Sequence, residues 1–189
     1  ACEVQAALGA THAAAFDVNS ACSGFITGYQ MAAGQMKAGL IRTALVIGSE
    51  CLSNGIDWTD RGTCILFGDG AGAAVLKAEG NPEDLCLPVV LHADGRKGHV
   101  LTCSVGHGKD KLSFDDYYRM DGREIFKFAV KKVPEVIREI LHCSGRQAEE
   151  IDYFLLHQAN RRIIEAIAKR LGQEESKFPM NIMENGNIS

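Results

Sequence analysis

Three residues whose side chains could together carry out thiol chemistry are spread along the chain: Cys22, His157 and Asn187. Each follows an apolar run that predicts a strand, and each lies where that run gives way to a turn or a helix. Active sites of α/β proteins form at such places, because the ends of neighbouring strands meet at one edge of a sheet. A cysteine nucleophile with a histidine and an asparagine as its companions suits acyl transfer.

Cys22 is the predicted nucleophile, because it directly precedes an amphipathic helix expected at 24–37. The positive end of a helix dipole favours the thiolate form of a cysteine. The competing interpretation is a small side chain packed under a tight turn. Ser23 is a weaker candidate, since no Gly-x-Ser-x-Gly motif surrounds it. Taken singly, His157 and Asn187 would be interpreted as structural and turn residues, so their case rests on the combination.

The composition is that of a globular protein: 189 residues, 46% hydrophobic, with a net charge of −4. This charge argues against a general affinity for nucleic acid. The sequence has no apolar stretch of about 18 residues and no secretory leader, so we expect a cytoplasmic protein with no membrane partner. Seven cysteines without a Cys-x-x-Cys pair argue against a disulfide framework or a structural metal site.

Alternating strand and helix patterns predict an α/β fold. We expect strands at 13–18, 41–48, 73–77, 85–92 and 152–156, with a further strand starting at 179–183. We expect helices at 24–37, 122–143 and 160–171, the second of them kinked or broken at Pro134. The glycine-rich segment 68–72 is expected to be a turn that allows close backbone packing, because a dinucleotide fingerprint would open a helix instead.

A polar, turn-rich cluster at 79–84 is the best candidate for a domain boundary. It divides the chain into residues 1–80, which carry Cys22, and residues 81–189, which carry His157 and Asn187. Ala1 starts inside an apolar helical pattern and Ser189 follows a candidate site residue closely, so we expect the chain to be an internal piece of a longer protein.

The chain resembles the β-ketoacyl-acyl carrier protein synthase III family, condensing enzymes of the thiolase-like superfamily. Five motifs stand in the family order, at 21–25, 59–63, 67–73, 157–160 and 186–187. The separations between Cys22, His157 and Asn187 are also similar to those of the family. The resemblance implies an α/β, thiolase-like fold, layered α/β/α/β/α, with two related halves and truncated here at both ends.

The activity that this resemblance implies is the initiation of fatty-acid synthesis by a decarboxylative condensation. Cys22 would take the acyl group of an acyl-CoA, with acetyl-CoA expected, and malonyl-acyl carrier protein would then supply the attacking enolate. His157 and Asn187 would donate hydrogen bonds to the enolate oxygen. Acyl-CoA and the acyl carrier protein are substrates here, so no cofactor and no metal are implied. The family also implies a homodimer.

Further residues receive roles only through the resemblance. For substrate and CoA binding it implies Arg61, Phe67, Phe126 and Asn160. For docking of the acidic carrier protein it implies Lys127 and Arg162, which lie in a basic stripe that would otherwise be interpreted as a solvated face.

Two alternatives stay open. One is a related Cys-His-Asn condensing enzyme of polyketide or alkylquinolone synthesis, distinguished by its acyl-CoA and by whether malonyl is carried on protein or on CoA. The other is a non-catalytic thiolase-like subunit that only binds acyl carrier protein. Such a subunit would be expected to have lost its nucleophile, and Cys22 is present.

Overall fold

The computed structural model of the protein describes residues 1–80, 88–103 and 117–189. Helices, short 3-10 helices (η) and strands follow one another in this order: α1 (Cys2–Ala7), η1 (Ala21–Ser23), α2 (Gly24–Lys37), β1 (Thr43–Cys51), η2 (Leu52–Gly55), β2 (Asp69–Lys77), η4 (Gly95–Val100), β3 (Leu101–Cys103), β4 (Tyr118–Met120), α3 (Gly122–Ser144), η5 (Ala148–Glu150), α4 (Arg161–Leu171), η6 (Glu175–Lys177) and α5 (Ile182–Asn185). This mixture of helices and strands is the α/β class that the sequence predicts.

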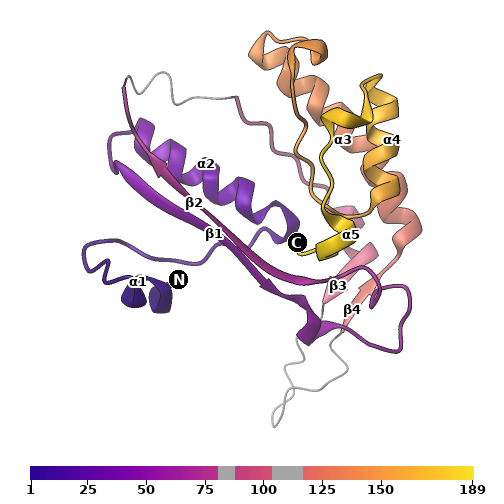
Figure 1. Cartoon of the computed structure of the whole chain (residues 1–189), viewed down its shortest axis with the longest axis horizontal. Helices are drawn as coiled ribbons and strands as arrows, with labels where there is room; N and C mark the ends of the chain where they lie inside the picture. Colours follow the sequence, from indigo (N-terminus) through magenta and orange to yellow (C-terminus); the bar gives the residue numbers. More distant parts are fainter. Residues whose placement is uncertain (81–87, 104–116) are drawn as a thin grey trace.

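The first part of the molecule is a long antiparallel pair of strands, β1 and β2, with α2 lying along one of its faces (Figure 1). Thr43 pairs with Lys77 at one end and Cys51 with Asp69 at the other. The predicted helix at 24–37 and the predicted strands at 41–48 and 73–77 are confirmed. The segment 68–72 is not the predicted turn, because its residues 69–72 form the start of β2.

Side chains of β1 alternate between the two faces of the sheet, as the pleat of a strand requires. Val46 is buried on the face that α2 covers, and a Cβ atom at Gly28 of α2 would lie 3.2 Å from its Cγ1 atom. Leu45 and Ile47 belong to the opposite face and are exposed. The small residue at position 28 thus lets α2 pack closely, while the other face of the sheet stays open.

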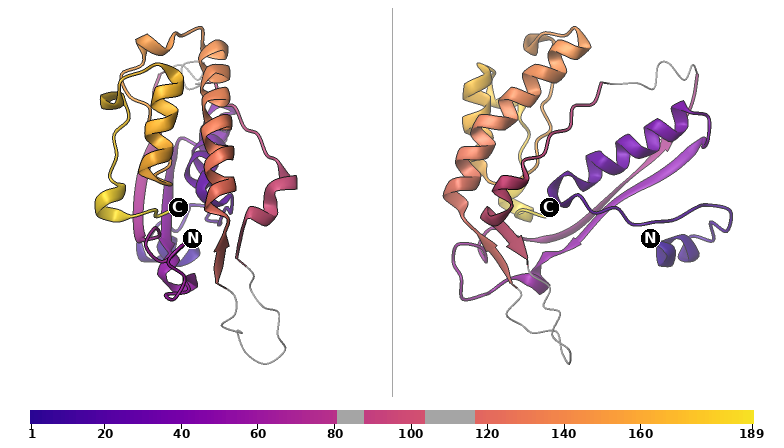
Figure 2. Two further views of the ribbon diagram at one scale, coloured as in Figure 1. Left: turned by 90° about the vertical axis from the view of Figure 1, so that its right-hand side faces the viewer. Right: turned by 180° about the vertical axis from the view of Figure 1, so that it is seen from behind.

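The second part of the molecule is built on α3 and α4, which lie side by side (Figure 2). The rings of Phe154 and Phe178 stack with their centroids 4.9 Å apart against the apolar face of α4. The buried residues of this core are Phe154, Ile163, Ile164, Ile167, Ala168 and Phe178. Each fully buried side chain of this kind contributes about 1.5–3 kcal/mol through the hydrophobic effect, so this core stabilises the second part.

Both long helices of the second part have defined ends. Asp121 caps α3 by accepting hydrogen bonds from the N–H groups of Arg123 and Glu124, at 3.1 and 3.0 Å. Gly145 ends the helix at a φ of +65°, a conformation that glycine adopts without steric cost. Pro134 lies inside α3, which continues through it as one helix from Gly122 to Ser144 rather than as two.

Four predicted strands are wrong or only partly described. Residues 13–18, 152–156 and 179–183 form no strand, and the last of these segments instead leads into α5. A strand is defined by hydrogen bonds to a neighbour, and apolar patterning alone does not supply that neighbour. Of the predicted strand at 85–92, the first three residues lie outside the described residues and the rest form no strand. Within the described ranges no helix is long and apolar enough to cross a membrane.

Candidate active site

Cys22 lies in the 3-10 turn η1, immediately before the first residue of α2, and its side chain is half-buried. The residue before it, Ala21, has a φ of +43°, which costs a non-glycine residue about 1–2 kcal/mol. Its N–H group donates to the Oδ1 atom of Asn19 at 3.2 Å, a bond that holds this turn. The thiol therefore lies on a strained, hydrogen-bonded turn, and its place at the start of a helix is the one that the sequence predicts.

Asn187 is buried, and its main chain is fixed on both sides. Its N–H group donates to the carbonyl oxygen of Leu66 at 2.7 Å, and its own carbonyl accepts from Gly68 at 3.0 Å. These bonds form a parallel bridge between Phe67 and Asn187. The side-chain Oδ1 atom accepts from the N–H group of Ser189 at 2.9 Å. The carboxamide is thereby oriented, and its N–H₂ group makes no hydrogen bond to the residues that the structure describes.

His157 lies in the irregular segment that precedes α4. The residue is exposed to solvent, yet the protein atoms around its ring partly desolvate it and lower its pKa below the ordinary value of 6.5. A backbone hydrogen bond with Ser189 acts in the opposite direction. The lowered pKa favours a neutral imidazole with one N–H donor at neutral pH.

Ser189 connects the three predicted catalytic residues. Its hydroxyl lies 3.7 Å from the Sγ atom of Cys22, its N–H group donates to the carboxamide oxygen of Asn187 at 2.9 Å, and its backbone acts to raise the pKa of His157. Figure 1 shows the same approach at the level of the ribbon, with the C-terminus beside the start of α2. Residues far apart in the sequence therefore meet at one place, and the sequence analysis missed Ser189 although it lies two positions after Asn187.

The glycine-rich segment at 68–72 makes this meeting possible. A Cβ atom at Gly68 would collide with the carbonyl oxygen of Asn185, and one at Gly70 would lie 3.0 Å from Ile188. Gly186 has a φ of +67°, and a Cβ atom at this position would lie 3.0 Å from the carbonyl oxygen of Leu66. The prediction of close backbone packing is confirmed for Gly68 and Gly70, which pack against the segment of Asn187, whereas Gly72 has open space around it.

Phe67 lies directly beside this centre, and its ring centroid is 5.6 Å from that of Tyr118. Desolvation raises the pKa of Tyr118, and the negative charges that Cys103, Glu50 and Cys22 would carry when ionised add to the shift. Nothing in the sequence indicated Tyr118, because its place here depends on the pairing of β3 with β4 and on the bare backbone of Gly55, which faces its ring.

A groove of about 440 Å³ opens between the first turns of α3 and α4. Its lining includes Phe126, Lys127, Asn160 and Arg162. The guanidinium of Arg162 lies over the ring of Phe126, 5.9 Å from its centroid. Asn160 also caps α4, since its Oδ1 atom accepts from the N–H group of Arg162 at 2.9 Å. Two helix N-termini and three cations, Arg123, Lys127 and Arg162, make this groove a favourable place for an anionic group.

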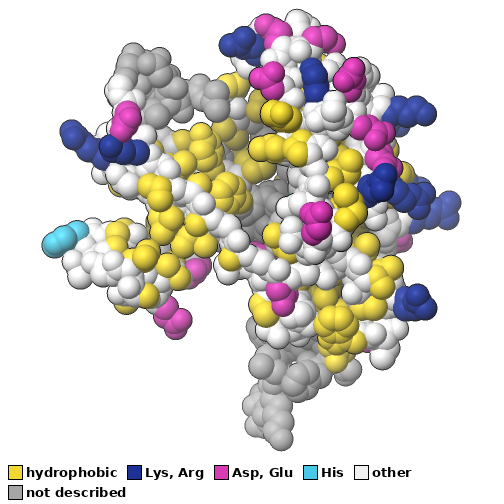
Figure 3. All heavy atoms as spheres, viewed as in Figure 1, with side chains coloured by type: hydrophobic (Ala, Val, Ile, Leu, Met, Phe, Trp, Pro, Cys, Tyr) yellow, Lys and Arg dark blue, Asp and Glu magenta, His cyan; other side chains and the backbone are white. Residues whose placement is uncertain are grey.

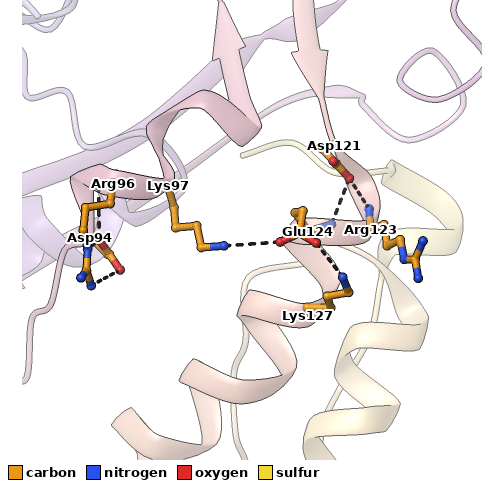
Figure 4. Close-up of polar contacts among 7 residues, drawn as sticks. All are labelled: Asp94, Arg96, Lys97, Asp121, Arg123, Glu124 and Lys127. Atoms are coloured by element: carbon orange, nitrogen blue, oxygen red, sulfur yellow. Dashed lines mark hydrogen bonds and ion pairs between the residues drawn. The ribbon is translucent and has the colours of Figure 1, made fainter.

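Lys127 is partly engaged by Glu124, one turn earlier on α3. Figure 4 shows Lys127 and Lys97 both pointing toward the Glu124 carboxylate, with Nζ–O distances of 2.6 and 3.4 Å, while Arg123 points away from it. Hydrogen bonds from Lys127 and Lys97 lower the pKa of Glu124, and the carboxylate in turn raises the pKa of Lys127. The ammonium group of Lys127 in the groove is therefore already paired with the Glu124 carboxylate.

Arg61 is exposed in the turn that follows Asp60, and the lining of the groove does not include it. The structure thus brings four of the six predicted binding residues together in the groove and places Phe67 beside Asn187, while Arg61 does not line the groove. Among the residues at 1–80, 88–103 and 117–189, no three histidine, cysteine or acidic side chains are arranged to hold a metal ion.

Comparison with known proteins identifies the family. A family model described as 3-oxoacyl-acyl-carrier-protein synthase III matches residues 16–95, and the model of its C-terminal region matches residues 141–189. The chain belongs to the 3-oxoacyl-acyl-carrier-protein synthase III family. A curated beta-ketoacyl-acyl-carrier-protein synthase III of Acaryochloris marina is 44% identical over the whole chain, which spans 59% of that relative. The chain therefore covers little more than half the length of such family members.

Solved structures agree on the thiolase-like fold of this family. The synthase III of Aquifex aeolicus superposes with a TM-score of 0.88 at 42% identity, over 100% of this chain and 58% of that one. A priming β-ketosynthase of the R1128 polyketide pathway superposes with a TM-score of 0.88 at 33% identity, over 98% of this chain and 56% of that one. The fold class and the family that the sequence analysis inferred are confirmed.

Proposed function

We propose that a protein of the relatives' length that carries this chain, called the parent protein below, starts fatty-acid chains as a β-ketoacyl-acyl carrier protein synthase III. The observation that carries the proposal is the meeting of Cys22, His157 and Asn187 through Ser189, with 3.7 Å between the Ser189 hydroxyl and the Cys22 sulfur. The family that the comparisons show supports it.

The first step is acyl transfer to Cys22. Its thiolate attacks the thioester carbon of an acyl-CoA, with acetyl-CoA expected, and a new C–S bond forms. The original C–S bond breaks and CoA leaves as its thiolate. The Cys22 N–H group would donate to the oxyanion of the tetrahedral intermediate.

The second step is decarboxylation and condensation. The malonyl group on acyl carrier protein loses CO₂, and the electron pair of the broken C–C bond passes to the thioester as an enolate. His157 and Asn187 donate hydrogen bonds to the enolate oxygen. The enolate carbon then attacks the acyl group on Cys22, whose thiolate leaves and is ready for another cycle. Neutral donors suit this role, and the lowered pKa of His157 keeps its imidazole neutral.

The groove between α3 and α4 is proposed as the route of the substrate arm. Phe126 and Asn160 would contact the pantetheine, Phe67 would contact the substrate near the catalytic centre, and Arg61 would stack on the CoA adenine. Lys127 and Arg162 would receive the acidic acyl carrier protein. Figure 3 supports this surface, since Lys and Arg side chains gather along the edge formed by α3 and α4.

Three further features belong to the same proposal. The parent protein would be a cytoplasmic homodimer, and its two related halves would divide near residues 80 and 81. Support for burial in a larger assembly comes from the face of the β1–β2 sheet opposite α2, where Leu45, Ile47 and Val75 are exposed. Apolar patches of this kind mark surfaces that other protein covers.

A second candidate is a priming condensing enzyme of polyketide or alkylquinolone synthesis. The likeness to the R1128 priming ketosynthase, at 33% identity, favours keeping it. Such an enzyme would share the chemistry of Cys22 and would differ in the starter acyl-CoA and in the carrier of the malonyl group.

The test is product formation by the parent protein, supplied with a panel of acyl-CoAs and with malonyl on acyl carrier protein or on CoA. The account expects a β-ketoacyl-acyl carrier protein and one CO₂ for each product. Preference for malonyl-CoA, or for a starter foreign to fatty-acid synthesis, would favour the second candidate. A folded parent protein that binds acyl carrier protein and forms no product would be the non-catalytic subunit.

A further inference from the structure

Gln158, the residue after His157, bonds two chain segments together. Its Nε2 atom donates to the carbonyl of Leu156 at 3.0 Å and to the carbonyl of Pro179 at 3.3 Å. Its Oε1 atom accepts from the N–H group of Asn181 at 3.1 Å. Both donor hydrogens and the acceptor oxygen of one half-buried carboxamide are thus used on the main chain.

The two segments that Gln158 joins are those that carry the predicted oxyanion donors. Residues 151–157 end at His157, and residues 178–181 lead through the single turn of α5 to Asn187. Farther from the site the segments are already tied by a main-chain bond, from the N–H group of Phe154 to the carbonyl of Lys177 at 2.8 Å. Gln158 adds two bonds at the end nearest the site, so it fixes one donor relative to the other.

We propose that Gln158 is a positioning residue that sets the separation and orientation of His157 and Asn187 for the decarboxylation step. The inference rests on the proposed function for the step it names. Two donors that share one oxyanion must both lie within hydrogen-bonding distance of it, and a misplacement of about 1 Å can cost about 100-fold in rate. Acylation of Cys22 does not use these two donors, so it is largely independent of Gln158.

The experiment compares the two half-reactions in the parent protein with Gln158→Met, which keeps the size of the side chain and removes its hydrogen bonds. Gln173→Met is the matched control, because Gln173 is also half-buried and bonds across segments, to Glu149 at 3.0 Å, at the far end of α4. Intact mass follows acylation of Cys22, and CO₂ release follows decarboxylation by the acylated enzyme.

For Gln158→Met we expect CO₂ release to fall about 10–100-fold while acylation changes by less than about threefold, and for Gln173→Met we expect both rates to be kept. Equal loss of both half-reactions in Gln158→Met would show a merely structural role and overturn the proposal. So would CO₂ release that is unchanged.

Gln158→Glu supplies a pH readout that a structural role does not predict. An ionised carboxylate facing the carbonyls of Leu156 and Pro179 is repelled, whereas its protonated form donates a hydrogen bond to one of them. The CO₂ release of this variant relative to wild type should therefore increase as the pH is lowered, and a ratio that does not vary with pH would count against the proposal.

A crystal structure of the Gln158→Met parent protein separates this proposal from the proposed function. If the wild-type parent protein makes no product, the proposed function fails, yet the structure still decides the positioning role. We expect the segment of Asn187 to move relative to His157. An unchanged separation of the His157 ring from the Asn187 carboxamide would overturn the inference.

Discussion

Residues 1–80, which carry Cys22, expose thirteen large hydrophobic side chains, whereas residues 117–189, which carry His157 and Asn187, expose four. The two regions are of similar length, so the difference lies in how completely each buries its apolar surface. In the second region α3, α4 and the stacked rings of Phe154 and Phe178 enclose a continuous core. In the first region α2 covers one face of the sheet, and Leu45, Ile47 and Val75 on the other face are exposed.

This comparison shows that the two halves of the chemistry depend on different parts of the fold. The proposed oxyanion donors are supported by a core that this chain itself completes. The proposed nucleophile lies at the start of α2, on a sheet whose outer face is uncovered within the described residues. Mutations should therefore separate the two regions, both in the reaction step they impair and in their effect on stability.

The largest effect is expected from Cys22→Ala in the parent protein. Condensation should fall by more than about 10⁴-fold, because removing a covalent nucleophile abolishes the route on which all later groups act. Product formation is measured by chromatography of the acyl carrier protein species. Cys51→Ala is the matched control, since Cys51 lies at the end of β1 and should be tolerated. Equal rates in wild type and Cys22→Ala would contradict the role of Cys22 as the nucleophile.

Asn187→Ala should lower CO₂ release by about 10²–10³-fold, the usual cost of losing one oxyanion donor. Its control is Asn185→Ala, an exposed asparagine two residues earlier on α5, which should remain close to wild type. If the Asn187 variant still becomes acylated on Cys22, the two regions serve different steps of the reaction. Loss of acylation and decarboxylation together would contradict this division.

The loss of stability on mutation should depend on how deeply the mutated side chain is buried. Ile164 is 1% exposed, so Ile164→Ala should lower the free energy of unfolding of the 189-residue chain by about 2–5 kcal/mol. Ile47 is 42% exposed, and Ile47→Ala in the same chain should cost less than about 1 kcal/mol. Urea unfolding followed by circular dichroism measures both. Similar losses for the two variants would contradict the contrast between a closed core and an open face.

The smallest expected effect is the pKa of His157, which desolvation lowers below the ordinary value of 6.5. Because the folded protein binds this proton less readily than the unfolded chain, the associated stability is fully present above the unfolded pKa and is lost as the pH falls through the lower pKa of the folded protein. A titration by NMR, with His157→Gln to assign the signal, measures the shift. A pKa at or above 6.5 would contradict the proposal that His157 acts as a neutral hydrogen-bond donor.

The sequence predicted the helices better than the strands. Residues 24–37 and 160–171 carry their own hydrogen bonds and an apolar face, so local patterning was enough to predict α2 and α4. The predicted strand at 13–18 is apolar as well, yet a strand needs a partner that the pattern does not name. The motifs around Cys22, His157 and Asn187 were found because each combines a reactive residue with a turn.

Other parts of the site depend on contacts between distant segments. Tyr118 reaches Phe67 only because β3 pairs with β4, and Ser189 reaches Cys22 only because the glycines at 68 and 70 admit the segment of Asn187. Glu124 could have been expected beside Lys127 from their spacing of three on one helix, whereas its bond to Lys97 could not.

The most direct test of the account is intact-mass spectrometry of the parent protein after incubation with acyl-CoAs, for wild type, Cys22→Ala and Asn187→Ala. The account predicts one acyl adduct on wild type and on Asn187→Ala, and none on Cys22→Ala. An adduct that persists in Cys22→Ala, or the absence of any adduct on a folded wild-type protein, would contradict it.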